Sequence, residues 1–492
     1  MVDQQGQHLD VLIVGAGLAG IDAAYRLAEK NPGIRYQIVE RRGRVGGTWD
    51  LFRYPGVRSD SDIFTLSFPF RPWTKDRTMA EGGEIRDYIE DTARELGIDE
   101  HIEFGIEVTA ADFDTTTDLW TVTASTSSGE VTYTARYLYL CTGYYSYDEG
   151  YLPDFPGMDD FTGTVVHPQF WPDDLDYAGR KVVVIGSGAT AVTLIPSMAP
   201  TAASVTMLQR SPTYMLPLPW QDPLTKILKR VLPAQAAHNV IRWRNALGTM
   251  GFYLYCRTFP KLSRRTLRAM AARMLPKGYD VDTHFKPRYE PWDERLCVIP
   301  DGDFYTSIRD GKAEVVTDTI DHFTPTGIEL TSGRHLDADI VVTATGLQLL
   351  PLGGAALSID GQEFKPHDKF AYRGYMLNDV PNLAWSVGYT NASWTLRVDL
   401  TSRAFADLIA YMREHGYTHA YPTVGDEVLE ERLLLSLDAG YIRRSASLLP
   451  KASTHNPWLV RHNLLLDAYD ARRYDVTESM VFGVALSSKS FA

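Results

Sequence analysis

The residues that decide the fold are Leu9-Asp-Val-Leu-Ile-Val14, then Gly15-Ala-Gly-Leu-Ala-Gly20 and a helical pattern that runs to Lys30. The apolar run predicts a buried strand and the glycines predict a tight turn, while Asn31-Pro32-Gly33 ends the helix. A return strand from Ile34 to Val39 ends on Glu40. These segments together predict a strand-helix-strand (βαβ) unit with parallel strands.

The glycine loop of this unit has the spacing GxGxxG. Gly15 allows the tight turn, Gly17 lets the backbone approach a pyrophosphate, and Gly20 permits close packing of the helix. The N-terminus of the helix then faces the negative phosphates. Glu40, 25 positions after Gly15, stands where a carboxylate accepts hydrogen bonds from ribose hydroxyls. We interpret this loop as an FAD site, and the alternative is a tight structural turn without a ligand.

A second copy of the unit starts at Lys181. It has a strand from Val182 to Ile185, a helix to about Ala199 and a strand from Ser204 to Leu208. Between the first strand and the helix lies the loop Gly186-Ser187-Gly188-Ala189-Thr190-Ala191, in which Ala191 replaces the third glycine. That replacement is permitted in dinucleotide loops, so we predict a second nucleotide here.

The residue type that follows the second unit differs from that in the first. Arg210 stands 24 positions after Gly186, at the place equivalent to Glu40. A carboxylate there repels a 2′-phosphate, whereas a guanidinium binds one. We therefore predict NADPH rather than NADH, against the alternative that Arg210 is a solvent-facing side chain without influence on cofactor choice.

The two units predict an α/β fold with two Rossmann-like dinucleotide-binding domains, for FAD and NADP, and a helical insertion. Small-residue turns at Cys141-Thr142-Gly143 and at the end of the strand that leads to Gly346 are interpreted as crossings between the domains, which makes the FAD domain discontinuous. The predicted segments are 1–145 and 345–492 for FAD, 146–215 and 293–344 for NADP, and 216–292 for the insertion.

The insertion is basic. It carries twelve Lys or Arg from Lys226 to Lys277, and Asp222 is the single acidic residue between Gln221 and Gly278. Two interpretations stay open: a solvated helical face, or peripheral contact with an anionic membrane surface that also admits apolar substrates.

Composition excludes several functional classes. The 492 residues carry a formal net charge of -13, which argues against a nucleic-acid partner. The three cysteines are too few and too widely spaced for a disulfide framework or a CxxC metal site, so we expect no metal and an intracellular, cytoplasmic protein. The polar N-terminus predicts no signal peptide, and no apolar run approaches the ~18 residues of a spanning helix.

Between the two loops lies a fingerprint that names a family. Phe161, Gly163, His167 and Trp171 fit the pattern FxGxxxHxxxW. A second pattern runs from Gly46-Gly47-Thr48-Trp49 through Tyr54-Pro55-Gly56 to Asp60. The chain resembles the Baeyer-Villiger monooxygenases, class B flavin monooxygenases, over essentially its whole length, and especially their mycobacterial members. Flavin-containing monooxygenases that oxidise amines and sulfides share both loops but typically end the fingerprint in an aromatic and a basic residue, unlike Trp171-Pro172.

The resemblance implies catalytic roles for two residues. Arg295 corresponds to the family's active-site arginine, which supplies positive charge beside reduced oxygen, and Asp60 corresponds to its acidic partner. Without the family, Arg295 would be interpreted as a surface salt bridge with Asp293 or Glu294. Gly47, Thr48 and Trp49 are expected to pass close to the flavin.

Three further segments receive interpretations from the resemblance. The resemblance implies that His167 and Trp171 belong to a linker that couples the two nucleotide domains. Without the family, His167 is more often a satisfied interdomain histidine than a catalyst. Ser393 is expected to cap a helix whose N-terminus stabilises the reduced flavin. Trp458 is expected in a mobile loop that closes on NADP.

These roles imply a reaction. NADPH would reduce the flavin, O₂ would add at carbon C4a to give a peroxyflavin, and a small apolar ketone, linear or aryl-alkyl, would become an ester, with sulfide or thioamide S-oxygenation as a side activity. Three alternatives remain: a monooxygenase specific for N or S heteroatoms, a flavin disulfide reductase, and a non-catalytic nucleotide-binding protein. The spacing of the cysteines argues against the disulfide reductase, and the presence of Asp60 and Arg295 argues against the non-catalytic protein.

Overall fold

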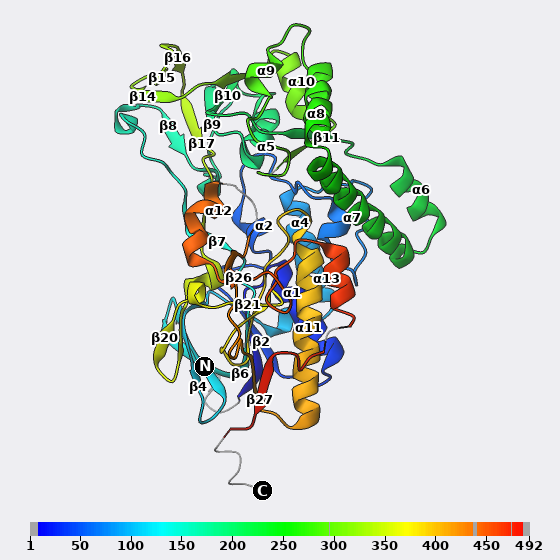
Figure 1. Cartoon of the computed structure of the whole chain (residues 1–492). Helices are drawn as coiled ribbons and strands as arrows, with labels where there is room; N and C mark the ends of the chain where they lie inside the picture. The colour runs from blue at the N-terminus through cyan, green and yellow to red at the C-terminus, as the bar shows by residue number, and fades with distance from the viewer. Residues whose placement is uncertain (1–7, 295, 436–439, 474, 486–492) are drawn as a thin grey trace.

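The structure is a computed structural model that describes residues 8–294, 296–435, 440–473 and 475–485. Two sheets stand at opposite ends of an elongated molecule, and helices cover them (Figure 1). Arg295, the predicted catalytic arginine, lies outside the described residues.

The larger sheet has the strand order β20-β19-β4-β5-β6-β1-β2-β3, with β23 paired to β6. Its strands are β1 (Leu9–Val14), β2 (Tyr36–Glu40), β3 (Ile102–Phe104), β4 (Glu107–Asp114), β5 (Leu119–Thr126), β6 (Gly129–Leu140), β19 (Ala356–Ile359), β20 (Gln362–Phe364) and β23 (Leu383–Trp385). β1 runs parallel to β2 and to β6, with Val11 opposite Tyr36 and Tyr137. The sheet therefore combines strands from both ends of the chain.

The smaller sheet is parallel throughout, with the order β13-β10-β9-β17-β8. Its strands are β8 (Thr164–Val166), β9 (Lys181–Ile185), β10 (Ser204–Gln209), β13 (Ala313–Thr317) and β17 (Ile340–Thr343). The helix α5 (Ala189–Met198) follows β9, just as α1 (Leu18–Lys30) follows β1. Both predicted βαβ units and the predicted fold class are confirmed. The boundaries of the five predicted segments stay a prediction.

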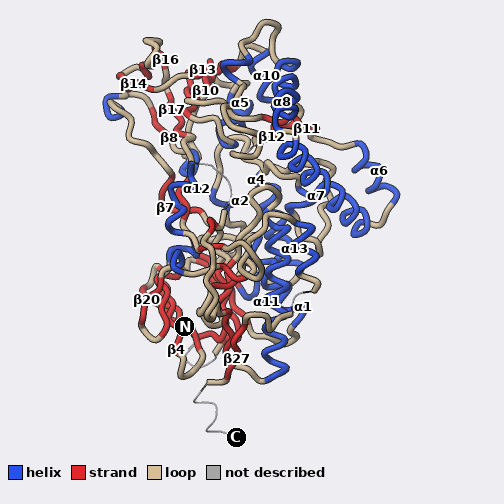
Figure 2. The backbone as a smooth tube through the Cα atoms, in the orientation of Figure 1, coloured by secondary structure: helices blue, strands red, loops and turns tan. Residues whose placement is uncertain are grey.

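The two crossings between the sheets lie side by side. β7 (Tyr145–Gly150) leaves the larger sheet and β18 (Leu347–Leu349) returns to it, and the two strands pair antiparallel. Figure 2 shows this connection as strand between the two ends of the molecule. The two crossings are therefore hydrogen-bonded to each other.

A layer of helices packs beside strand β1 of the larger sheet. α1 packs against α11 (Trp394–His415), and Arg26 of α1 forms a buried salt bridge of 2.6 Å with Asp399 of α11. Asp22 lies fully buried in the same interface. Burial and the neighbouring Asp399 raise the pKa of the Asp22 carboxyl well above its ordinary value. α4 (Gly82–Glu95) adds to this helical layer.

The predicted helical insertion consists mainly of α6 (Pro223–Val231), α7 (Ala234–Thr258) and α8 (Pro260–Met274). Arg242 anchors α7, because its buried guanidinium donates to the carbonyls of Phe64, Thr65 and Ser67 at and just after α3 (Ile63–Leu66). The first residues of the predicted insertion, 216–218, form strand instead, since β11 (Met215–Leu218) pairs with β12 (Cys297–Pro300).

The remaining elements are short. They are α2 (Thr48–Leu51), α9 (Val281–His284), α10 (Asp303–Arg309), α12 (Gly440–Ser445), α13 (Leu464–Asp470), β14 (Ile320–Thr324), β15 (Gly327–Leu330), β16 (His335–Asp337), β21 (Ala371–Tyr372), β22 (Met376–Leu377), β24 (His419–Pro422), β25 (Arg432–Leu433), β26 (Lys451–Ala452) and β27 (Met480–Gly483). Among the described residues, none of the helices combines the length and the apolar character needed to cross a bilayer.

Candidate active site

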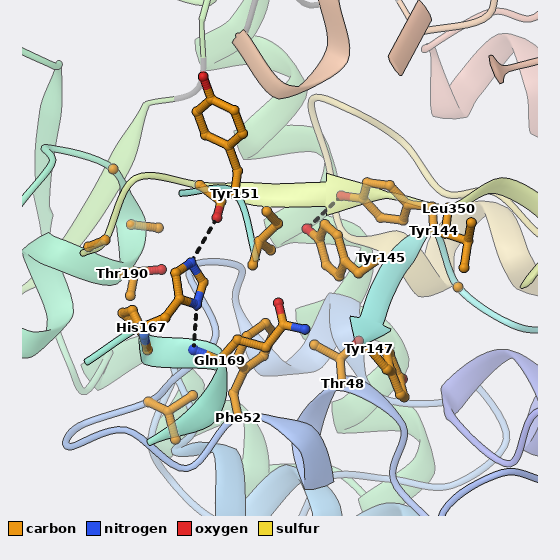
Figure 3. Close-up of a pocket in the computed structure, with 18 of the residues that line it drawn as sticks. Thr48, Phe52, Tyr144, Tyr145, Tyr147, Tyr151, His167, Gln169, Thr190 and Leu350 are labelled. Atoms are coloured by element: carbon orange, nitrogen blue, oxygen red, sulfur yellow. Dashed lines mark hydrogen bonds between the residues drawn. The ribbon is translucent and has the colours of Figure 1, made fainter. Parts of the chain in front are cut away.

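A cavity of about 990 Å³ is lined by both glycine loops. Gly15 and Gly17 line it from the first loop, and residues 186–190 line it from the second. Gly17 and Gly188 are the N-cap residues of α1 and α5, so the N-termini of both helices face this space. Figure 3 shows Thr48, near the first loop, and Thr190, in the second, on different sides of it. One cavity can therefore hold two anionic cofactors near each other.

Two glycines of the first loop stand where a side chain would not fit. Gly15 has φ +105°, and a Cβ atom on it would lie 2.5 Å from the carbonyl oxygen of Cys141. A Cβ on Gly20 would lie 1.9 Å from the carbonyl oxygen of Gly15. Gly15 thus makes the turn and Gly20 allows the helix to approach it, as the spacing predicts. Gly20 itself does not line the cavity, so it acts through packing.

Glu40 ends β2 and lines the same cavity. Its carboxylate accepts hydrogen bonds from the backbone N–H groups of Ala16, at 2.7 Å, and Arg42, at 2.8 Å. Burial raises the pKa of Glu40, and these two hydrogen bonds oppose that rise. Glu40 therefore also ties the glycine loop to the end of β2, a structural role that the sequence did not reveal.

The second predicted flavin contact approaches the first loop closely. A Cβ on Gly47 would lie 3.1 Å from Cα of Gly17, and Gly47, Thr48 and Trp49 all line the cavity. Two backbones without side chains, a buried carboxylate at a strand end and the N-terminus of α1 are what a dinucleotide pyrophosphate and ribose require. The residues present fit FAD.

Asp60 also lines the cavity and is half buried. On either side of the undescribed Arg295, Glu294 and Cys297 line it too. Asp293 pairs with Arg257 at 2.6 Å. The chain around position 295 thus reaches the cavity that Asp60 faces.

Arg210 directly follows β10 and lines the cavity with an exposed side chain. In the described part of the chain, no carboxylate forms a salt bridge with it. Ser187 of the second loop donates a hydrogen bond of 3.2 Å to the carbonyl of Ser211, which ties the loop to the segment after β10. The guanidinium of Arg210 is therefore available to an anionic ligand.

His167 is the fingerprint residue that lines the cavity. Its Nδ1 accepts a hydrogen bond of 3.2 Å from the N–H of Gln169, and its Nε2 lies 3.2 Å from the carbonyl of Gly346 (Figure 3). Because Nδ1 accepts, Nε2 carries the proton and donates it to that carbonyl. Burial lowers the pKa of His167, so the ring is neutral at neutral pH. His167 thus links the outbound segment to Gly346 on the return crossing.

The other fingerprint residues pack rather than line the cavity. Phe161 is buried against Phe323, and a Cβ on Gly163 would lie 2.4 Å from the carbonyl of Asp339. Trp171 packs against the core of the smaller sheet. The fingerprint is therefore mostly a set of packing requirements around the crossing.

Two expectations for aromatic and capping residues need correction. Ser393 does stand at the N-cap of α11, but its side chain makes no capping hydrogen bond. Its hydroxyl instead pairs with that of Thr65 at 2.5 Å, and it does not line the cavity. Trp458, expected in a mobile loop, is fully buried against Tyr372 in the core of the larger sheet.

Sequence reasoning missed an aromatic wall. The ring of Tyr144 stacks on Trp394 at 4.7 Å and 8°, and its hydroxyl lies 2.8 Å from that of Tyr145. All three residues line the cavity, and Figure 3 shows the two tyrosines next to each other. The available signal was Tyr144-Tyr145 directly after the predicted crossing at Gly143.

Sequence reasoning also missed an ion pair beside the cavity. Arg58, within the predicted pattern that ends at Asp60, binds Asp303 of α10 at 2.6 Å, and its side chain is 8% exposed. Arg58 lines the cavity, and its Nη2 has no hydrogen-bond partner among the described residues. This pair joins the loop after α2 to the helix that follows β12.

Comparison with known proteins identifies the family. A protein-family model described as pyridine nucleotide-disulphide oxidoreductase matches residues 12–216. The FAD-containing monooxygenase EthA of Mycolicibacterium smegmatis is 50% identical over 462 residues, which cover 94% of each chain. The chain belongs to the FAD-containing monooxygenases. This monooxygenase is also 46% identical to the probable FAD-binding monooxygenase AlmA of Acinetobacter baylyi, over 94% of this chain and 93% of that one.

Solved structures confirm the fold of the monooxygenase. The open crystal structure of cyclohexanone monooxygenase superposes with a TM-score of 0.75 at 22% identity, over 97% of this chain and 100% of that one. Oxidized steroid monooxygenase bound to NADP gives 0.75 at 23%, with the same coverage. The predicted class, a flavin monooxygenase, is confirmed, and the Baeyer-Villiger assignment stays a prediction. The prediction of FAD and NADP as cofactors agrees with the names of these proteins.

The disulphide chemistry in the name of the family model does not extend to this monooxygenase. Cys141, Cys256 and Cys297, all among the described residues, are buried and form no disulfide bond. They lie after β6, in α7 and in β12, so none is paired with another as a redox dithiol requires.

Proposed function

We propose that the enzyme is an NADPH-dependent Baeyer-Villiger monooxygenase that converts small apolar ketones, linear or aryl-alkyl, to esters. Sulfides and thioamides are proposed as secondary substrates. The observation that carries the proposal is the single cavity shared by both glycine loops, Asp60 and the residues on either side of position 295. NADPH and the flavin would then lie close together in one cavity, next to the residues proposed to act on oxygen.

Each glycine loop receives one cofactor in this proposal. The first loop, Glu40 and Gly47 would hold FAD, and the second loop with Arg210 would hold NADPH. When bound, the flavin accepts hydride from NADPH and, once reduced, activates O₂. The protein contributes orientation, charge and exclusion of water.

Arg295 and Asp60 are proposed as the catalytic pair. An arginine is permanently protonated and can stabilise negative charge where oxygen accepts electrons. Asp60, at the wall of the cavity, would orient that guanidinium. The stacked rings of Tyr144 and Trp394 would restrict water on one side, which favours oxygen transfer over release of hydrogen peroxide.

His167 is proposed as a positioning residue. Neutral at neutral pH, it donates to the carbonyl of Gly346 and is suited to link cofactor binding to the paired crossings β7 and β18. The N-terminus of α11 is proposed to face the flavin through Trp394, which lines the cavity, rather than through the side chain of Ser393.

Product analysis tests the proposal. The purified holoenzyme with NADPH and O₂ should convert 2-octanone to an ester, identified by mass spectrometry. Arg295→Ala should abolish the ester while FAD stays bound and NADPH oxidation yields hydrogen peroxide. Arg288→Ala is the matched control, because Arg288 is exposed and does not line the cavity. An enzyme that oxidises a thioether but no ketone would instead be a heteroatom-specific monooxygenase, and an Arg295→Ala variant that still forms ester would refute the catalytic role.

A further inference from the structure

The insertion concentrates exposed apolar side chains. Of 22 large apolar residues that are exposed in the described chain, nine lie between positions 224 and 262. Val231 is 67% exposed and Trp243 is 42% exposed. Single exposed apolar residues are common on protein surfaces, but a cluster of this kind marks an interaction site.

Seven of these residues lie on two neighbouring helices, three on α6 and four on α7, and on each helix they form an apolar stripe. We call them the insertion stripe: Leu224, Ile227 and Val231 on α6, and Val240, Trp243, Leu247 and Leu254 on α7. The spacings i, i+3 and i+7 place the members of each helix on one face. Figure 1 shows α6 and the N-terminal end of α7 projecting from the side of the molecule.

Other faces of the two helices already have partners. Ala237 and Ile241 of α7 are buried in the core of the larger sheet, and Leu228 of α6 packs against that core. Each of the two helices therefore has one apolar face packed against the core and a second apolar face, the insertion stripe, that is exposed. A helix with one face in a core normally turns polar residues to water.

The charge of the insertion is one-sided. Positions 223–277 contain twelve Lys or Arg and no Asp or Glu, whereas the rest of the chain has 37 basic and 62 acidic residues. Several of these cations are paired, such as Arg244 with Asp222. Arg230, Lys261 and Arg265 are exposed, and no carboxylate among the described residues forms a salt bridge with them.

Some of the cations border a hollow. A cavity of about 230 Å³ beside α8 is lined by Lys261, Arg264, Arg265 and Arg268, together with Lys286 and two aromatic residues. Arg264 pairs with Glu290, and Arg268 and Lys286 both pair with Asp282. Lys261 and Arg265 are therefore the cations at this hollow that form no salt bridge with a described carboxylate, and they can reach lipid phosphates beside it.

We propose that α6, α7 and α8 dock the enzyme on an anionic lipid bilayer. The insertion stripe enters the interfacial region, Trp243 sits at the level of the headgroups, and the unpaired cations contact lipid phosphates. A second copy of the chain suits this face poorly, since two insertions facing each other would bring 24 cations together. An acidic protein surface would satisfy the cations but leave the insertion stripe unmatched.

Docking at this face would place the enzyme beside apolar molecules dissolved in the bilayer. The inference does not depend on ketone oxidation, because it rests only on the surface of the insertion. A failure of the ester assay therefore leaves it unaffected.

Vesicle sedimentation with the full-length holoenzyme tests docking. Binding to vesicles of phosphatidylcholine and phosphatidylglycerol should exceed binding to phosphatidylcholine alone at least tenfold, and should fall at high salt because the contacts are electrostatic. Arg230→Glu with Arg265→Glu should weaken binding tenfold or more. Ile227→Ser with Trp243→Gln should do so with the charges intact.

Controls separate docking from damage. Val428→Ser changes an apolar side chain that is 95% exposed outside the insertion, and it should bind vesicles like the unaltered enzyme. All variants should keep their flavin spectrum and unfolding temperature. Equal binding to both kinds of vesicle, or no binding to either, would overturn the proposal. So would a concentration-dependent dimer in sedimentation velocity that Trp243→Gln abolishes, since the insertion stripe would then be a self-association surface.

Discussion

Replacing Arg210 by alanine tests how the enzyme distinguishes its nicotinamide cofactors. The side chain is exposed at the cavity wall just after β10, and no described carboxylate forms a salt bridge with it. A 2′-phosphate within reach would therefore interact with a guanidinium that has no competing anion. NADH lacks this phosphate, so its use should not depend on Arg210.

The size of the effect follows from exposure. Two unit charges about 4 Å apart attract by about 1 kcal/mol in water and about 4 kcal/mol at an effective dielectric near 20. Because Arg210 is exposed, the lower part of this range applies, about 1 to 2 kcal/mol. We expect kcat/KM for NADPH to fall roughly 5- to 30-fold in Arg210→Ala, while kcat/KM for NADH stays unchanged.

The measurement is steady-state oxidation of NADPH and of NADH in air, in which the loss of nicotinamide absorbance gives kcat/KM for each cofactor. Arg210→Lys should retain most of the preference, since the charge remains. Arg309→Ala is the matched control, because Arg309 is an exposed arginine of α10 that does not line the cavity. An unchanged NADPH-to-NADH ratio in Arg210→Ala, or an equal loss with both cofactors, would refute the assignment.

Two further predictions concern buried carboxyl groups. Glu40→Gln should raise the Kd for FAD about 10- to 100-fold, since the charged acceptor of the Ala16 and Arg42 N–H groups is lost, and FAD titration of apoprotein with unchanged affinity would contradict this. The raised pKa of Asp22 means that the folded state keeps a proton which the unfolded chain loses near pH 4, so stability should decline as pH rises from about 5 to about 8. Asp22→Asn should flatten this decline in unfolding temperature, and an unaltered slope would exclude Asp22 as its source.

The local parts of the fold were predictable from the chain. Both βαβ units appear with boundaries within a few residues of the predicted ones, because hydrophobic periodicity and glycine spacing are short-range signals. The predicted roles of Gly15 in the turn and Gly20 in helix packing match the loop, since a missing Cβ is a property of the residue itself. The predicted approach of Gly17 to a pyrophosphate stays a prediction. The paired roles of Asp60 and Arg295 stay predictions.

Contacts between distant segments were less accessible to sequence reasoning. Serine is a common helix cap, yet the hydroxyl of Ser393 forms its hydrogen bond with the hydroxyl of Thr65. Thr65 is close in space although it lies 328 positions away along the chain. Trp458 was expected in a loop, but it is fully buried in a core, where its ring packs against Tyr372. In both cases the structure shows a contact with a residue far away in the sequence in place of the expected local arrangement.

The sequence by itself determined the two nucleotide-binding units, the acid that ends one and the arginine that follows the other. Turn geometry and strand periodicity act within about 30 residues, so they can be read from the chain alone. Only the tertiary structure decided that both loops line one cavity, that Tyr144 stacks on Trp394 beside it, and that Arg58 pairs with Asp303. These contacts depend on how two sheets and their crossings pack, and packing sums many small long-range interactions that no local pattern records.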